Sequence, residues 1–155
     1  MVSHVNASNI DSGTLSDLRL SGNVALLNAT SNTFTGAMAV NGDVIVGGVL
    51  NLGKQDLIIA DNGLGTPATT TLTPTKSYVR VNCVDSDGCG VTLGEGGAVE
   101  GDTLVILNDG SGNPVTITDS PGVSELAGNF VGGSLDTLSL IYDGNAWVET
   151  ARSNN

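Results

Sequence analysis

Basic residues are scarce in this chain of 155 residues: five Lys and Arg stand against sixteen Asp and Glu, and the net charge is −11. Binding to nucleic acid or to an anionic membrane surface needs clustered Lys and Arg, so neither partner is expected. No apolar run reaches about 18 residues, so no membrane-spanning helix is predicted. Residues Met1 to Asp11 lack the basic start and apolar centre of a signal peptide, and export by that route is not expected.

Charged residues of both signs make up only 14% of the chain, whereas 22 residues are Gly. This composition is unfavourable for long charged helices and favours short strands joined by Gly and Asn turns. Aromatic residues are also few, with two Phe, two Tyr and one Trp, and Phe34 is alone in the first half. We therefore predict an all-β chain. Its second half can build its own core, while its first half must bury its apolar residues against something else.

The clearest pattern is a C-terminal β-hairpin over Ser134 to Arg152. Its first strand carries large apolar residues at every second position, as a half-buried strand does, namely Leu138, Leu140 and Tyr142. Asp143-Gly144-Asn145 supplies residues suited to a tight turn. The return strand, Ala146 to Ala151, brings Trp147 beside Leu140 or Tyr142, and this cluster is predicted to be the densest part of the core.

The same hairpin has a second apolar face. Ile141 and Val148 point away from the predicted core and also need cover. This second face is the first indication of a partner subunit.

Residues 36–63 contain an internal repeat of apolar pairs separated by Gly-containing turns. The pairs recur every six or seven residues, at Met38/Val40, Val44/Val46, Leu50/Leu52 and Leu57/Ile59. Each pair fits a short strand with two side chains on one side. A single-chain hexapeptide solenoid needs about three strands per coil, so this repeat would give too few coils to bury a core. We predict an interwound stalk of three identical chains; the alternative is a meander of short strands packed on the second half.

The chain is predicted to have four parts. Residues 1–35 show weak periodicity and are interpreted as an N-terminal attachment segment, followed by the repeat stalk of 36–63. Residues 64–77 are rich in Thr and Pro and are predicted to be a semi-rigid linker. Residues 78–155 are predicted to form a head that is a small antiparallel β-sandwich, jelly-roll-like, because short strands recur at close spacing.

Two runs of the sequence resemble segments of bacteriophage tail-fibre and spike-type virion structural proteins. The first contains Gly13-Thr14-Leu15, Arg19-Leu20-Ser21 and Asn32-Thr33-Phe34-Thr35-Gly36, elements that in this family precede a β-rich trimeric shaft. Ser16 stands where the family often has Pro. The second run resembles a head module of phage structural proteins in five elements: Gly101-Asp102-Thr103-Leu104, Leu126-Ala127-Gly128-Asn129-Phe130, Asp136-Thr137-Leu138, Tyr142-Asp143-Gly144 and Trp147.

The resemblance implies a homotrimer exposed on the virion surface and assembled in the host cytoplasm. We expect a short fibre or spike that attaches to tail or capsid proteins through its N-terminal segment. Its knob is expected to adhere to the host surface, with cell-surface glycan as a candidate partner. A capsid decoration or cement protein of the same trimeric architecture, which clamps capsid subunits, is the alternative. A small glycan-degrading tailspike is a third, disfavoured hypothesis.

Metal binding is weighed at one acidic stretch. Asp85-Ser86-Asp87-Gly88 is similar to the start of an EF-hand calcium loop, but the twelfth position, where such a loop needs Glu, is Gly96. An irregular calcium site using Asp85, Asp87, Glu95 or Asp109 is an alternative to solvated loop carboxylates. No metal or cofactor is predicted, and His4, the single histidine, is expected to be a solvated or locally bonded side chain.

Cys83 and Cys89 are the two cysteines of the chain. Two thiolates and one distant histidine cannot form a tetrahedral zinc site. Because phage proteins assemble in the reducing cytoplasm, where disulfides are uncommon, we predict two free thiols.

No catalytic residue is predicted, and the chain is not expected to be an enzyme. The sequence has no nucleophile elbow, and its Gly-rich GEGGAVEGD stretch lacks the Lys of a phosphate-binding loop. Glycan hydrolysis would need a bulky cleft with two carboxylates, and the few aromatic residues are mostly committed to the core. The loops at 84–90, 108–114 and 119–133 are predicted as the adhesive contact surfaces.

Overall fold

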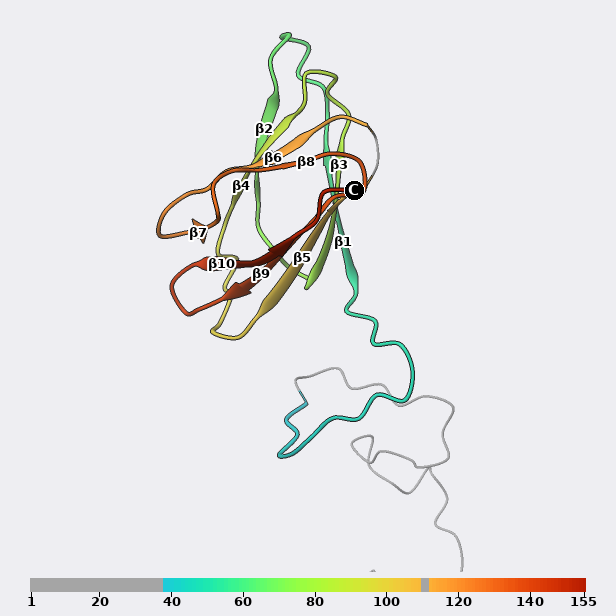
Figure 1. Cartoon of the computed structure of the whole chain (residues 1–155), viewed down its shortest axis with the longest axis vertical. Coiled ribbons are helices and arrows are strands. Elements are labelled where there is room, and N and C mark those ends of the chain that lie inside the picture. Colours follow the sequence, from blue (N-terminus) through green and yellow to red (C-terminus); the bar gives the residue numbers. More distant parts are fainter. Residues whose placement is uncertain (1–37, 110–111) are drawn as a thin grey trace, which may run out of the picture. The chain divides into compact units, whose positions relative to one another are not determined.

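The computed structural model of this chain describes residues 38–109 and 112–155 (Figure 1). Every regular element in these ranges is a β-strand, which confirms the all-β prediction. Among the same residues there is no helix of the length and apolar character that a membrane span requires. The chain divides into two units, residues up to Gly47 and Gly48–Asn155, and the strands all belong to the second unit.

The strands form two sheets. The six-stranded sheet has the order β1-β3-β5-β9-β10-β7, and the four-stranded sheet has the order β2-β4-β6-β8. The strands span β1 Lys54–Ile59, β2 Ala68–Leu72, β3 Tyr78–Cys83, β4 Cys89–Leu93, β5 Thr103–Asn108, β6 Val115–Ile117, β7 Ser124–Glu125, β8 Phe130–Gly132, β9 Thr137–Tyr142 and β10 Trp147–Arg152.

From β1 to β6 the chain passes alternately through the two sheets, in a β-solenoid-like arrangement. β1, β3 and β5 stack in parallel in the six-stranded sheet, where Lys54 lies opposite Tyr78. β2, β4 and β6 stack in parallel in the four-stranded sheet, where Cys89 lies between Ala68 and Val115. A parallel pair needs a long crossover between its strands, and here the intervening strand of the other sheet is part of that crossover.

The prediction of an antiparallel, jelly-roll-like sandwich is therefore wrong for these strands. It assigned the wrong pairing direction, because β3 pairs with β5 and β4 pairs with β6 in parallel. The physical reason is that alternation of apolar and polar residues shows which side of a strand faces the core. It does so equally well in parallel and antiparallel sheets.

Antiparallel pairs close one end of the stack, where only the short β7 pairs in parallel, with β10. β8 pairs with β6, β9 with β5, and β10 with β9 in the antiparallel direction. The predicted C-terminal hairpin is confirmed, since Trp147 lies opposite Tyr142 and their rings meet edge to face, with centroids 5.3 Å apart. The Asp143 carboxylate accepts the N–H groups of Asn145 at 2.9 Å and Ala146 at 2.8 Å, which fixes the turn.

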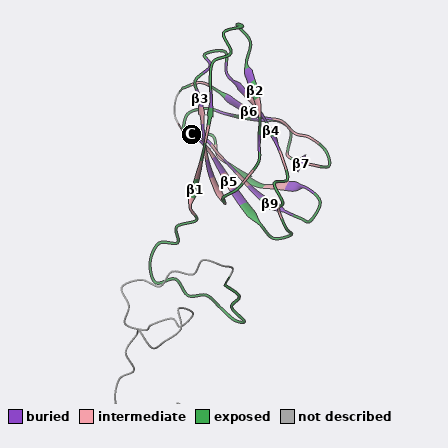
Figure 2. Cartoon of the chain, turned by 180° about the vertical axis from the view of Figure 1, so that it is seen from behind, coloured by how far each residue is buried: buried purple, intermediate pink, exposed green. Residues whose placement is uncertain are grey.

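The core lies between the sheets and is built from the inward-facing residues of both (Figure 2). In β3, for example, Val79 and Val81 are buried, while Arg80 between them is only partly buried. Parallel stacking places Val79 beside Ile106 in one sheet and Val91 beside Ile117 in the other. Burial of side chains of this size contributes about 1.5–3 kcal/mol each. These rows of apolar contacts therefore hold successive circuits of the stack together.

The predicted linker over residues 64–77 is wrong in part, because it contains β2. This strand pairs with β4 along all of its residues, from Ala68 to Leu72. The Thr-rich run does favour an extended backbone, but that backbone is a strand of the four-stranded sheet. The predicted head boundary at residue 78 is also too late, because β1 and β2 both pair with strands of the head.

The two parts of the repeat predicted over residues 36–63 differ in structure and in burial. Its last pair, Leu57 and Ile59, belongs to β1 and packs on the core, so this unit is buried within its own subunit, as the alternative of strands packed on the second half expects. The residues of 38–52 form no strand and are exposed (green in Figure 2). The predicted attachment segment, 1–35, lies outside the described residues.

Candidate functional site

The connections between the sheets lie at two corners of the head. Because β1 and β3 are parallel, the segments that follow them, 60–67 and 84–88, lie at the same corner, which we call the disulfide corner. The segments that follow β2 and β4, 73–77 and 94–102, lie at the other corner, which we call the pocket corner.

A disulfide joins Cys83, the last residue of β3, to Cys89, the first residue of β4. Both residues are buried, and their Cα atoms are 5.8 Å apart, within the range that a disulfide spans. The prediction of two free thiols is therefore wrong. It rested on the compartment in which the chain is thought to assemble, whereas the tight corner brings the two side chains together at the edge of the core.

Asp85 lies between the two cysteines, and its buried carboxylate organises the disulfide corner. Oδ2 accepts the N–H of Ala68 at 2.9 Å, and Oδ1 accepts the N–H of Asp87 at 3.0 Å. A buried carboxylate is costly unless its oxygen atoms accept hydrogen bonds, and these two bonds meet that requirement. Asp85 therefore links the start of β2 to the next turn of the stack.

The acidic residues of the calcium hypothesis serve different parts of the head. Asp85 binds backbone N–H groups, Asp109 faces Arg80 at 3.5 Å, and Glu95 lies at the pocket corner. Within residues 38–109 and 112–155 there is no group of three or more side chains placed to hold a metal ion. The irregular calcium site is therefore wrong as a grouping of these residues.

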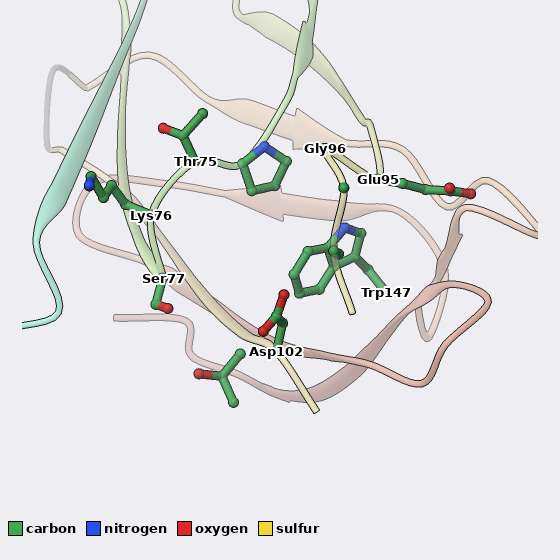
Figure 3. Close-up of a pocket in the computed structure, with 11 residues that line it drawn as sticks. Thr75, Lys76, Ser77, Glu95, Gly96, Asp102 and Trp147 are labelled. Atoms are coloured by element: carbon green, nitrogen blue, oxygen red, sulfur yellow. The ribbon is translucent and has the colours of Figure 1, made fainter. Parts of the chain in front are cut away.

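A pocket of about 270 Å³ opens at the pocket corner (Figure 3). It lies between the connection from β2 to β3 and the connection from β4 to β5, with the indole of the C-terminal hairpin inside. Most of its lining residues are small or polar: Pro74, Thr75, Lys76, Ser77, Glu95, Gly96, Gly97, Ala98, Asp102, Thr103 and Trp147.

Close contact between the two loops shapes the pocket. Gly96 has a φ of +64°, and a Cβ atom at this position would lie 2.8 Å from the carbonyl oxygen of Pro74, so only glycine fits without a shift. Gln55 of β1 supports the other loop from below. Its side-chain oxygen accepts the N–H of Thr75 at 2.8 Å, and its side-chain nitrogen donates to the carbonyl of Thr73 at 3.1 Å.

Trp147 forms the floor of the pocket and is only 3% exposed. Its Nε1–H donates to the carbonyl of Gly94 at 3.3 Å, which ties the floor to the loop above. The Asp102 carboxylate points toward the indole, whereas Glu95 and Lys76 extend away from it (Figure 3). Asp102 Oδ2 also accepts the N–H of Val99 at 3.0 Å, so this carboxylate helps to fix the loop.

Negative charge gathers near the same corner. Burial raises the pKa of the Tyr142 hydroxyl, and the carboxylates of Glu95 and Asp143 raise it further. The backbone N–H groups of Ala146 and Asn145 lower the pKa of Asp143. Tyr142 and Asp143 therefore keep fixed protonation states near neutral pH, neutral and ionised respectively.

The pocket offers polar groups that could bind a polar ligand. It offers the hydroxyl groups of Thr75, Ser77 and Thr103, which can donate and accept hydrogen bonds. Glycoside hydrolysis would need two carboxylates on either side of one bond, but Glu95 and Asp102 point in different directions (Figure 3). The almost buried indole leaves little ring surface on which a sugar could stack.

The predicted contact loops are placed elsewhere. The range 84–90 lies at the disulfide corner and enters β4, 119–133 contains β7 and β8, and 108–114 is described except for residues 110 and 111. None of the described residues in these ranges lines the pocket at the other corner. The Gly-rich run at Gly94–Gly97 is a signal of close backbone approach that could have indicated the pocket loop, but its contact with Pro74 could not be inferred from sequence.

No protein family matches this chain, and no curated protein is found to match it. The resemblance to phage virion proteins therefore stays an expectation, and function is argued from the residues and their geometry.

Proposed function

We propose that this chain is a bacteriophage virion surface protein, a homotrimeric short fibre or spike whose β-rich head adheres to the host surface. In this proposal residues 1–35 attach the protein to other virion proteins. The apolar pairs of 36–53 form an interwound stalk with those of two sister chains. The head begins at β1, so the stalk is shorter than the sequence repeat, and no enzymatic activity is proposed.

The observation that carries the proposal is the exposure of the apolar residues before β1. Ile45 and Val49 expose 92% and 96% of their surface, and Met38, Val44 and Leu50 are also exposed. Burying a side chain of this size contributes about 1.5–3 kcal/mol of stability. A run of such residues left in water therefore forgoes a large stabilising free energy that burial would supply. Contiguous exposed apolar residues mark interaction surfaces, and sister chains with the same repeat can cover one another around a shared axis.

The small pocket supports adhesion that depends on several copies. At about 270 Å³ it lies just below the ~300–1,000 Å³ of typical small-molecule sites, so a single head would hold one polar group, such as a sugar hydroxyl cluster, weakly. Three linked heads turn weak contacts into firm attachment, because the second and third contacts form at high effective concentration. This favours a multivalent host glycan as the partner.

Mass in solution tests the trimer. We expect sedimentation of the full chain to give three times the chain mass. Val46→Asn combined with Val49→Asn should shift the species toward the monomer, because both apolar side chains are lost from the stalk. Ser86→Asn, an exposed change at the disulfide corner, is the matched control and should leave the trimer intact. A monodisperse monomer of the parent chain at micromolar concentration would disprove the proposal.

Location and cell binding separate the adhesive fibre from the capsid alternative. We expect the fluorescently labelled trimer to stain host cells and to lose staining after enzymatic removal of surface glycans. Absence of staining together with the protein at capsid three-fold positions would instead assign it to capsid decoration.

A further inference from the structure

The two outer faces of the head differ in chemistry. The outward-facing residues of β2, β4 and β6 are mostly threonine, with Thr71 and Thr92 joined through their hydroxyl oxygens at 3.0 Å. The outer face of the six-stranded sheet carries larger apolar residues on four strands. Each is next to a buried residue of its strand and therefore points outward: Tyr78, Val105, Leu107, Ile141 and Val148.

These apolar residues lie on four neighbouring strands, β3, β5, β9 and β10. Tyr78 lies opposite Val105 in the pairing of β3 with β5. Ile141 lies opposite Val148 in the pairing of β9 with β10. Where β5 pairs with β9, Val105 lies opposite Ser139 and Ile141 opposite Thr103, so the two apolar groups are diagonal neighbours on this face, a spacing that large side chains can bridge.

The charges on this face nearly cancel, although the chain as a whole carries −11. Two outward-facing groups are basic, Lys54 and Arg80, and two are acidic, Asp56 and Glu125, as alternation with core residues on their strands places them. Lys54 pairs with Asp56 at 2.6 Å, and Arg80 faces a further carboxylate, that of Asp109, at 3.5 Å. A second copy of this acidic chain could therefore approach this face with little net repulsion.

We propose that the outer face of the six-stranded sheet packs against sister subunits within the trimer, so that the heads form one body instead of three separate knobs. This inference rests on the proposed trimer. The occupant is a second copy because the exposed residues Val49, Leu50 and Leu52 lead directly into β1, the edge strand of this same sheet. Sister chains that cover these residues arrive beside the face.

The area of this face limits how strongly the heads can bind one another. Six strands about 4.8 Å apart and about 20 Å long present roughly 500 Å². A stable interface buries about 800 Å² on each partner. The head face is thus too small to hold subunits together alone, and it orders heads that the stalk has already joined.

Thiol labelling of the full chain tests this contact. The native cysteines are joined in a disulfide, so one introduced cysteine is the single free thiol. Ile141→Cys lies on the proposed interface, and Thr92→Cys on the threonine face is the matched control, since both positions are exposed in the single chain. We expect maleimide to label position 141 at least about tenfold more slowly than position 92, because an interface thiol reacts only when the contact opens.

The outcomes distinguish this inference from the proposed function. A trimer by sedimentation with equal labelling at both positions would overturn the head contact and leave the fibre proposal standing. A monomeric parent chain would overturn both. Val148→Cys, on the adjacent strand of the same face, repeats the measurement if Ile141→Cys does not fold, and its protection relative to Thr92→Cys is expected to be the same.

Discussion

The two ends of the stacked sheets are finished in different ways. At the C-terminal end, Arg152 pairs with Glu149, donates to the carbonyl of Gly128 at 3.2 Å and lies 5.7 Å from the centre of the Phe130 ring. The Glu149 carboxylate also accepts the N–H of Ala127 at 2.9 Å. This cluster, which we call the C-terminal latch, spans from β10 to β8 and so joins the two sheets.

The N-terminal end has no comparable closure among the described residues. Both ends of the stack finish in edge strands, but β1 and β2 at this end have six and five residues, whereas β7 and β8 at the other end have two and three. The ion pair there, between Lys54 and Asp56, lies on the surface, and a concave region of about 580 Å³ is lined by β1, β2 and the segment between them. A long strand edge is a template for further strands, whereas a very short edge strand limits such pairing, so the comparison shows one self-sufficient end and one end suited to continuation.

Removing the indole of Trp147, at the C-terminal end of the stack, should have the largest effect on stability. Trp147→Ala deletes a buried indole that contacts Tyr142 and bonds to Gly94. We expect the free energy of unfolding to fall by about 3–5 kcal/mol, measured by chemical denaturation. Val131→Ala, at an exposed position of β8, is the control and should cost less than about 0.5 kcal/mol. Equal effects of the two changes would contradict a core at this end.

Loss of the disulfide should have the next largest effect. It joins β3 of one sheet to β4 of the other, midway between the two ends of the stack. Because it closes a short loop, replacing both Cys83 and Cys89 by Ala should lower the free energy of unfolding by about 2 kcal/mol. Denaturation of the parent with and without reductant measures the same quantity. An unchanged midpoint under reducing conditions would contradict this expectation.

The C-terminal latch should contribute a smaller, pH-dependent amount. Arg152→Gln should lower the free energy of unfolding by about 1 kcal/mol at neutral pH. The hydrogen bond from Arg152 lowers the pKa of Glu149 from its usual 4.5, so this stabilisation is present above pH 4.5 and is lost as the pH falls through the lowered pKa. Denaturation from pH 7 into the acid range should thus show a steeper loss in the parent than in the variant. Parallel pH profiles would contradict a role for this ion pair.

The ion pair of the N-terminal end, between Lys54 and Asp56, should contribute least to the free energy of unfolding. Lys54 and Asp56 have side chains that are 44% and 49% exposed, so water and salt screen their attraction. We expect Lys54→Gln to change the free energy of unfolding by less than about 0.5 kcal/mol, measured beside Arg152→Gln at equal ionic strength. A loss as large as that of Arg152→Gln would remove the distinction between the two ends.

The C-terminal hairpin could be predicted from sequence because its information is local. Leu138, Leu140 and Tyr142 alternate along one strand, Asp143-Gly144-Asn145 supplies the turn, and Trp147 follows within a few residues. Apolar and polar residues also alternate along β3, and every second residue of β5 is buried, but such alternation does not specify the direction in which strands pair. The parallel stacking was therefore missed.

The candidate site could not be predicted because it depends on contacts between distant segments. The pocket requires the carbonyl of Pro74 to meet Gly96, and nothing in either loop specifies the other. The disulfide likewise depends on where β3 and β4 enter their sheets, which a judgement about redox compartment cannot supply.

The parallel stack has a consequence for how the length of this protein can vary. One circuit of the chain covers 24 residues from Lys54 to its partner Tyr78, and 27 residues from Tyr78 to Val105. Duplication or deletion of one complete circuit would keep inward positions inward and leave the closing hairpin unchanged. Gene segments of this size are therefore natural units for making longer or shorter versions, while shorter insertions belong in the corner loops.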